Sequence, residues 1–205
     1  MTTSKSELCG GSASLQILRS IRVTGSLSPS PFSLPSLSLV IGGARSGKSA
    51  YAERLLTLAA RPRRYIATAE AWDDEMRDRI RRHRLDRGPA WTTVEAPLDL
   101  ATALAASPAT DAVLVDCATL WLTNHLLADH DLDTTTSALL TALAACPAPV
   151  VIVTNETGWG IVPDNALARR FRDAQGRLNQ RLAAQATLVV TVIAGLPLAL
   201  KGTLP

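Results

Sequence analysis

The stretch from Ser36 to Ser49 reads SLSLVIGGARSGKS and decides the fold. Its first part, Leu37–Ile41, is a short apolar run typical of a buried strand, and Ala50–Ala60 after it has a helical pattern. Between them, residues 42–49 match the pattern G-x-x-x-x-G-K-[ST]. Glycines let several backbone N–H groups converge on one oxyanion, and the N-terminus of the following helix adds partial positive charge there. The stretch therefore predicts a loop that binds a nucleoside triphosphate, rather than a glycine-rich turn that happens to precede Lys-Ser.

Two side chains of this loop are expected to act on the triphosphate. Lys48 should reach the β- and γ-phosphates as a catalytic residue, and the Ser49 hydroxyl should ligate Mg²⁺. Asp116 ends the apolar run AVLVD and predicts the second Mg²⁺ ligand, because the carboxyl ends of parallel strands meet at one edge of a sheet. The alternative for Asp116 is a solvated side chain at a strand end. The predicted loop residues are Gly42, Gly43, Ala44, Arg45, Ser46, Gly47, Lys48 and Ser49.

Composition and charge narrow the class of protein. The 205 residues are enough for one domain, and 47% hydrophobic with 19% charged residues is typical of a soluble globular protein. The net charge is +3, and residues 1–36 contain three basic side chains against one acidic one, so the remainder is nearly balanced. Bulk charge therefore predicts no nucleic-acid partner. Three widely spaced cysteines favour a reducing, cytoplasmic setting, and no apolar run approaches the roughly eighteen residues that would cross a membrane.

Alternating strand and helix patterns predict the fold class. We expect an α/β, three-layer fold of the P-loop NTPase type, with a mostly parallel central sheet flanked by helices. The expected strands are 37–41, 64–68, 91–95, 112–115, 150–153 and, as the last one, 188–193. The expected helices are 50–60, 69–84, 98–106, 120–127, one from 131–136 to 145, and one from 164 or 165 to about 185. Residues 1–36 contain ten serines and no periodicity, which predicts a disordered leader, a transit peptide or an upstream-start artefact preceding the domain at 37–205.

His83 is the candidate nucleophile. It shares one face of the expected 69–84 helix with Trp72, Met76 and Ile80, which by itself favours a packed core side chain. Its neighbours Arg79, Arg82, Arg84 and Arg87 argue otherwise, since crowding by cations keeps the ring neutral and able to attack a phosphorus. The alternative is that these arginines form a solvated basic face.

Further polar residues follow other expected elements. Asn155 and Glu156 come after the 150–153 strand and are candidates for a γ-phosphate sensor and a general base, unless they form only a polar transition to a loop. His125 and His130 have no partners at metal-ligand spacing and are interpreted as bystanders. The long helix after residue 164 contains more polar groups than a solvated face requires, and spacing does not reveal their role: Arg169, Arg172, Arg177, Asn179 and Gln180.

Five segments together are more specific than the phosphate loop alone. They are GGARSGKS (42–49), YIATAEAWDDEMRDRIRRHR (65–84), RGPAWTTVE (87–95), VDCATLWLTN (115–124) and VTNETGWGIVPDNALARRFRDAQGRLNQRLA (153–183). From about Leu37 to about Leu196, the chain resembles the bifunctional adenosylcobinamide kinase and adenosylcobinamide-phosphate guanylyltransferase family of cobalamin biosynthesis. The serine-rich leader departs from the usual start of that family, near its first strand.

The resemblance implies a RecA-like fold and two activities. A nucleoside triphosphate (ATP or GTP) phosphorylates adenosylcobinamide, and GMP is then transferred from GTP to that phosphate through a guanylylated histidine, whose matching position is His83. The resemblance also implies a homotrimer and, besides the phosphate loop, these nucleotide contacts: Thr68, Ala69, Glu70, Arg84, Leu85, Asp86, Arg87, Glu95 and Asp116. Two other classes stay open, a plain P-loop small-molecule kinase and a RecA-like nucleic-acid ATPase or nucleotide switch.

Overall fold

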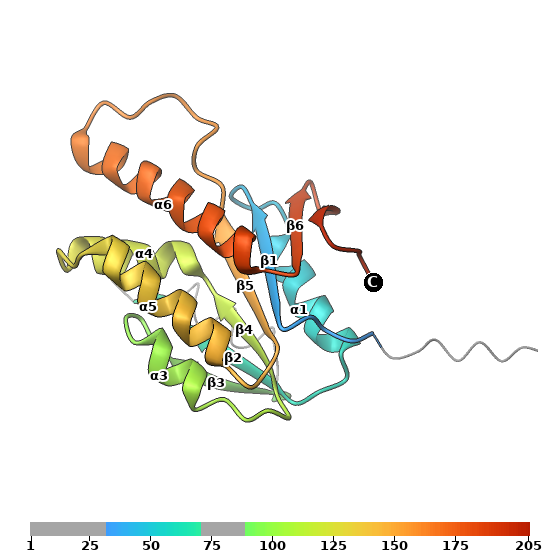
Figure 1. Cartoon of the computed structure of the whole chain (residues 1–205). Helices are drawn as coiled ribbons and strands as arrows, with labels where there is room; N and C mark the ends of the chain where they lie inside the picture. The colour runs from blue at the N-terminus through green and yellow to red at the C-terminus, as the bar shows by residue number, and fades with distance from the viewer. Residues whose placement is uncertain (1–31, 71–88) are drawn as a thin grey trace, which may run out of the picture. The chain divides into compact units, whose positions relative to one another are not determined.

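The described part of the chain is built on one seven-stranded sheet. The computed structural model describes residues 32–70 and 89–205, shown with their element labels in Figure 1. The strands are β1 (Leu37–Gly42), β2 (Arg63–Ala67), β3 (Trp91–Glu95), β4 (Ala112–Asp116), β5 (Val150–Asn155), β6 (Leu188–Ile193) and β7 (Leu196–Lys201). Their order in the sheet is β3-β2-β4-β5-β1-β6-β7, and all neighbours are parallel except β6 and β7.

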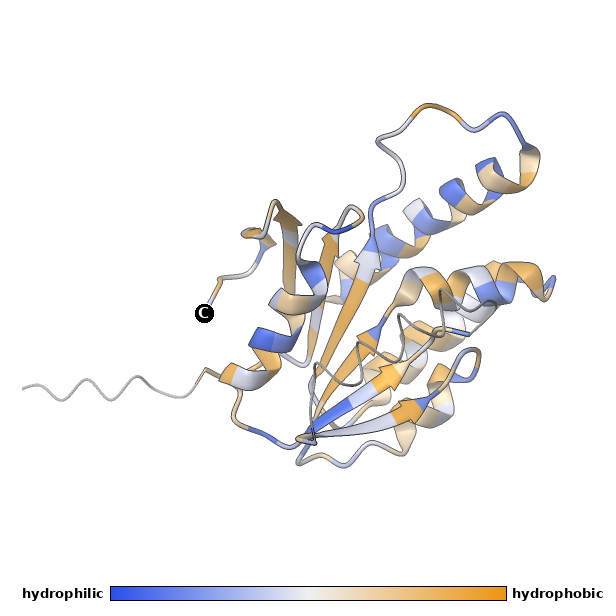
Figure 2. Cartoon of the chain, turned by 180° about the vertical axis from the view of Figure 1, so that it is seen from behind, coloured by the Kyte–Doolittle hydropathy of each residue, from blue (hydrophilic) through white to orange (hydrophobic). Residues whose placement is uncertain are grey.

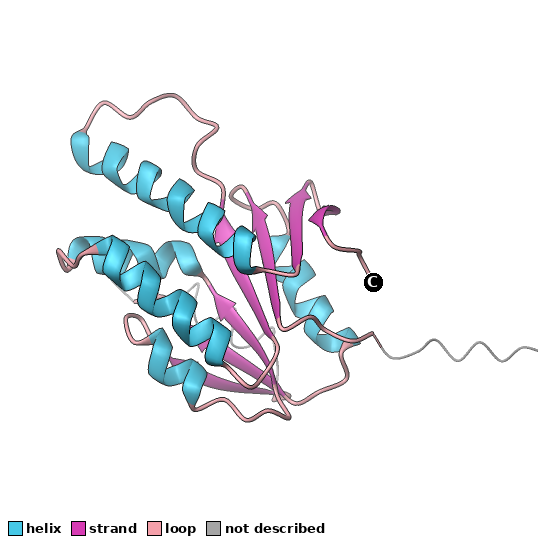
Figure 3. Ribbon diagram, viewed as in Figure 1, coloured by secondary structure: helices cyan, strands magenta, loops and turns pink. Residues whose placement is uncertain are grey.

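Helices cover both faces of this sheet, as the ribbon in Figure 3 shows. They are α1 (Lys48–Leu58), α3 (Leu100–Ala105), α4 (Ala118–Leu127), α5 (Leu132–Ala145) and α6 (Ala166–Gln185). Successive strand residues point to opposite faces. Val40, Leu114 and Val153 accordingly pack with α1, whereas Leu39, Val115 and Ile152 pack with α3–α6. The expected three-layer α/β fold is therefore confirmed, and Figure 2 shows the apolar strands between the helices.

Helix starts follow the capping chemistry of the sequence. Asp99, Asp131 and Asn165 each accept a hydrogen bond from the backbone N–H three residues later, at the starts of α3, α5 and α6. Of the two caps expected for the long helix, Asp164 and Asn165, the structure therefore has Asn165. The start of α1 differs, because Gly47 precedes it and gives no side-chain cap.

The structure differs from the expected elements at the C-terminal end of the sheet, and it describes little of the expected 69–84 helix. The prediction that 188–193 is the last strand is wrong, because the chain reverses at Ala194 and Gly195 and adds the antiparallel edge strand β7. Both turn residues have positive φ, 51° and 80°, as a two-residue hairpin turn of type I′ requires, and Ala194 is an unusual residue for this turn. Most of the expected 69–84 helix lies outside the described residues, and Ala69 and Glu70 at its start are not helical. Within the described part of the chain, no helix is both long and apolar enough to span a bilayer.

Candidate functional site

The candidate site residues gather at the carboxyl ends of five parallel strands. The register pairs Gly42 with Asn155, Asp116 with Val153, and Ala67 with both Asp116 and Glu95. Alternation along the strands places Gly42, Asp116 and Asn155 on the face that α1 covers, because Val40, Leu114 and Val153 two residues earlier pack with α1. Glu95 belongs to the same face, because Val94 before it packs against the cluster on the opposite face. The phosphate loop, Asp116 and Glu95 therefore share one edge and one face of the sheet.

The phosphate loop is held in a compact conformation by its own backbone and by β6. Ser46 N donates to Gly43 O at 3.3 Å, and Lys48 Nζ donates to the same carbonyl at 3.1 Å. Arg45 and Gly47 have positive φ values of 54° and 94°. At Gly42 a Cβ atom would lie 2.6 Å from the carbonyl oxygen of Val192, so only glycine fits there without a shift.

The hairpin turn between β6 and β7 supports the loop from outside. Gly195 N donates to Ser46 O at 2.8 Å, and the Cα of Gly195 is 3.1 Å from the place where a Gly47 Cβ would be. Gly195 is not among the residues predicted from the sequence to belong to the site. A glycine after an apolar run indicates a turn, but only the fold shows that this turn contacts the phosphate loop.

The loop has the features that a phosphate requires. The first turn of α1 carries no acidic residue and no side-chain cap, so its N–H groups are available to an anion. The buried Ser46 hydroxyl has no hydrogen-bond partner within the described structure, and Lys48 lies in the same loop. These residues therefore fit a bound triphosphate.

Asp116 lies two strands from the phosphate loop strand, with β5 between them. Its Oδ2 accepts a 2.9 Å hydrogen bond from the Tyr65 hydroxyl, which orients the carboxylate on the α1 face. Adjacent strands lie about 4.8 Å apart, so the backbones of β1 and β4 are about 10 Å apart. A carboxylate on β4 and a hydroxyl at the start of α1 are oxygen ligands of the type that Mg²⁺ accepts, directly or through water.

Thr68 and Cys117 are tied together behind Asp116. Thr68 Oγ1 donates to Cys117 O and accepts from Cys117 N, both at 2.8 Å, and Asn124 Nδ2 donates to Thr68 O at 2.9 Å. Thr68 is fully buried, and its hydroxyl is engaged with Cys117. Burial, and after it the Asp116 carboxylate, raises the pKa of the Cys117 thiol to about 11, so this cysteine is not a nucleophile at neutral pH.

Some expected site residues lie outside the described residues. These are His83, Arg84, Leu85, Asp86 and Arg87. Ala69 and Glu70 are described and follow β2 as irregular chain at the carboxyl edge of the sheet.

Comparison with known proteins agrees with the motifs. The family described as "Cobinamide kinase / cobinamide phosphate guanyltransferase" (CobU) matches residues 38–200. The bifunctional adenosylcobalamin biosynthesis protein CobP of Pseudomonas aeruginosa is 48% identical over 167 residues, covering 80% of this chain and 96% of that protein. Its counterpart CobU of Salmonella typhimurium is 44% identical over 179 residues, covering 80% and 98%. The chain belongs to the cobinamide kinase / cobinamide phosphate guanyltransferase family.

The expected family and enzyme class, a kinase and guanyltransferase, are thereby confirmed. Solved structures with a partly similar fold include flagellar accessory protein FlaH from Methanocaldococcus jannaschii, with 13% identity, a TM-score of 0.46, and coverage of 83% of this chain and 80% of that chain. The RadB recombinase has 16% identity, a TM-score of 0.43 and coverage of 77% and 74%. These likenesses are too low to support an argument about function.

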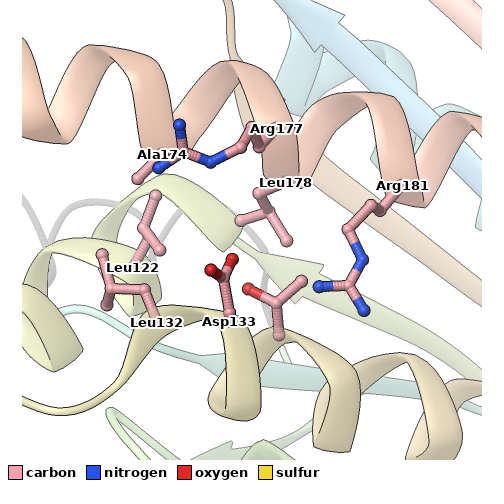
Figure 4. Close-up of a pocket in the computed structure, with 8 residues that line it drawn as sticks. Leu122, Leu132, Asp133, Ala174, Arg177, Leu178 and Arg181 are labelled. Atoms are coloured by element: carbon pink, nitrogen blue, oxygen red, sulfur yellow. The ribbon is translucent and has the colours of Figure 1, made fainter.

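Several arginines of α6 contact neighbouring parts of the fold. Arg169 Nη1 donates to Pro163 O at 2.9 Å and to the carbonyl of Asp164, which closes the loop before α6. Arg181 extends from α6 toward α5, where its Nη2 donates to Ser137 Oγ at 2.9 Å. With Arg177 and Asp133 it lines a hollow of about 10 Å³, room for one water at most (Figure 4). That hollow is too small for a nucleotide.

His125 and His130 hydrogen-bond to each other, with 2.8 Å between their Nδ1 atoms. The other ring nitrogen of His125 lies 3.2 Å from Leu98 O. Burial, followed by the charge of His130, lowers the pKa of His125, while the Leu98 carbonyl opposes this shift. The pair connects the loop after α4 to the segment before α3.

Proposed function

We propose that this enzyme phosphorylates the aminopropanol hydroxyl of adenosylcobinamide and then transfers GMP from GTP to the new phosphate, giving adenosylcobinamide-GDP. Family membership supports both activities. The observation that carries the proposal is the phosphate loop at the start of α1, with uncapped N–H groups, Lys48 and the buried Ser46 hydroxyl.

In the first transfer the loop residues bind and orient the triphosphate. Lys48 and the N–H groups at the start of α1 stabilise the charge that develops on the β- and γ-phosphates. Ser49 and Asp116 would hold Mg²⁺, which supplies positive charge to the phosphate oxygens when bound. Asn155 ends β5 beside the loop and Glu156 follows it, and these two residues are the candidate γ-phosphate sensor and general base.

In the second transfer His83 is the proposed nucleophile. Its neutral ring nitrogen forms a bond to the α-phosphorus of GTP as the bond to pyrophosphate breaks. The phosphate of adenosylcobinamide phosphate then attacks that phosphorus and releases the histidine. The pKa of Cys117, raised to about 11, keeps this neighbour of Asp116 from competing as a nucleophile.

The remaining proposed contacts come from the family resemblance. They are Thr68, Ala69 and Glu70 after β2, Glu95 at the end of β3, and Arg84, Leu85, Asp86 and Arg87 after the histidine. The proposal also includes ATP or GTP as phosphate donor, a homotrimer, a cytoplasmic location, and a leader at 1–36 that takes no part in the chemistry.

The test is a product analysis by mass spectrometry. The full chain, with Mg²⁺, GTP and adenosylcobinamide, should form first the phosphorylated and then the GDP-linked corrinoid. His83→Ala should stop at adenosylcobinamide phosphate, and Lys48→Ala should slow both steps. A wild-type enzyme that stops at the phosphate would be a plain small-molecule kinase, and one that leaves the corrinoid unchanged would refute the proposal.

A further inference from the structure

The sheet splits at its carboxyl edge between β4 and β5. The β4–β5 pairing ends at Asp116 and Val153, while β5 continues beside β1 as far as Asn155 and Gly42. The N–H and C=O of one strand residue point to the same neighbouring strand. At Asn155 these groups face the β4 side, where the ladder has ended and the chain has turned into α4.

Side chains from two helices take the place of the missing strand partner. Asn155 N donates to Thr119 Oγ1 at 2.8 Å, in the first turn of α4. Asn155 O accepts from Asn179 Nδ2 at 3.0 Å, in the middle of α6. Both polar backbone groups of Asn155 are therefore held by side chains, one from each helix.

A buried polar network connects these two side chains. Thr154 Oγ1 donates to Asn179 Oδ1 at 2.8 Å and lies 3.4 Å from Thr119 Oγ1. Gln175 Nε2 donates to Thr154 Oγ1 at 2.9 Å and to Asn179 Oδ1 at 2.8 Å. All four side chains are buried, and Gln175 Oε1 has no partner in the described residues. The network thus places several polar side chains in the interior, where each depends on the others for its hydrogen bonds.

The network holds the end of β5 from the α4 and α6 face of the sheet, and the candidate site lies on the opposite face. The Thr154 side chain points toward α4 and α6, and the next residue, Asn155, belongs to the face of α1 and the phosphate loop. On the β1 side, Glu156 N donates to Gly42 O, the first glycine of the loop, at 3.2 Å. Since β5 lies between β1 and β4, Asn155 and Glu156 come between the loop and Asp116.

We infer that Thr119 and Asn179, supported by Gln175, are positioning residues that hold Asn155 and Glu156 in the geometry of transfer. The inference rests on the proposed function, in which these two residues act on the nucleotide. Transfer requires groups held within a fraction of an ångström, and two side-chain hydrogen bonds to the backbone of one residue, one on each of its two peptide units, provide this.

The experiment compares Thr119→Val, which removes the hydroxyl at nearly constant shape, with Thr119→Ser, which keeps it. Thr119→Val should lower kcat for corrinoid phosphorylation about tenfold, the size of a lost hydrogen bond to a buried N–H, with the nucleotide KM changed less than about twofold. Thr119→Ser should restore most of the rate. Gln180→Ala, one residue beyond Asn179 on the exposed side of α6, is the matched control and should behave as wild type.

A double-mutant cycle separates positioning from general stability. In an Asn155→Ala or a Glu156→Gln background, Thr119→Val should lose most of its effect on kcat, because the group it positions is gone. Additive effects in both backgrounds, or equal rates for Thr119→Val and wild type, would overturn the inference while the proposed function stands. If Thr119→Val does not fold, Thr119→Ala takes its place in the same cycle. A wild-type enzyme without either transfer would instead refute the proposed function.

Discussion

The two consecutive glycines at the start of the phosphate loop are expected to respond differently to an added methyl group: Gly42→Ala should destabilise the protein, and Gly43→Ala should leave its stability unchanged. A Cβ at Gly42 would lie 2.5 Å from Ser46 Oγ and 2.6 Å from Val192 O. The serine hydroxyl can rotate away, but the carbonyl belongs to the backbone of β6, which is paired on both sides. At Gly43 a Cβ would meet nothing within 4 Å. Gly42→Ala therefore strains the sheet, whereas Gly43→Ala adds a methyl group to open space.

The magnitude follows from these contacts. Relieving the contact at Gly42 costs about 1–3 kcal/mol, as for other overpacked sites, while Gly43→Ala should stay within about 0.5 kcal/mol of wild type. In a domain of this size the first cost lowers the Tm by roughly 2–12 °C. Thermal unfolding of both variants, without nucleotide, measures the difference. Equal Tm values, or a lower Tm for Gly43→Ala, would refute the assignment of the close contact to Gly42.

Three further predictions concern a histidine, the metal ligand and a turn glycine. Burial lowers the pKa of His125 below 6.5, so the unfolded chain binds the proton more tightly than the folded chain does. In urea denaturation, the free energy of unfolding should stay constant above about pH 6.5 and decrease at lower pH, and this decrease should be less steep in His125→Asn. Asp116→Asn should reduce the rate of Mg²⁺-dependent transfer at least about a hundredfold in steady-state assays. Tyr65→Phe, which removes one hydrogen bond to Asp116, should reduce the same rate about tenfold or less. Equal losses of rate in the two variants would contradict a metal role for Asp116. Gly195→Ala should cost about 1 kcal/mol in denaturant titrations because of its positive φ of 80°, and an unchanged midpoint would contradict this.

Local pattern was sufficient for much of the fold. The phosphate loop was predictable because its glycines, Lys48 and Ser49 lie within eight consecutive residues between a strand and a helix. The carboxyl-edge position of Asp116 followed from the rule that parallel strands end together, and the register confirms it. Strand β7 was missed because Pro197 and the leucines of LPLALK lie on an exposed edge, where alternation carries little information.

Long-range contacts were beyond the reach of sequence spacing. Thr119 and Gln175 are ordinary helix residues in the sequence, and only the packing of α4 and α6 against the end of β5 brings them together. The same holds for Gly195, which hydrogen-bonds to Ser46 although the two residues lie near opposite ends of the domain's sequence. The sequence leaves the polarity of Asn179 unexplained, because its role depends on a backbone carbonyl that no side-chain pattern reveals.

The central claim is that GTP bound in the phosphate loop transfers GMP through His83. Incubation with GTP labelled at the α-phosphorus, followed by denaturation, tests it most directly. The account predicts an acid-labile label that stays with the wild-type chain and is absent from His83→Ala. A label that persists in His83→Ala, or a wild-type chain that turns over the corrinoid without retaining any label, would contradict it.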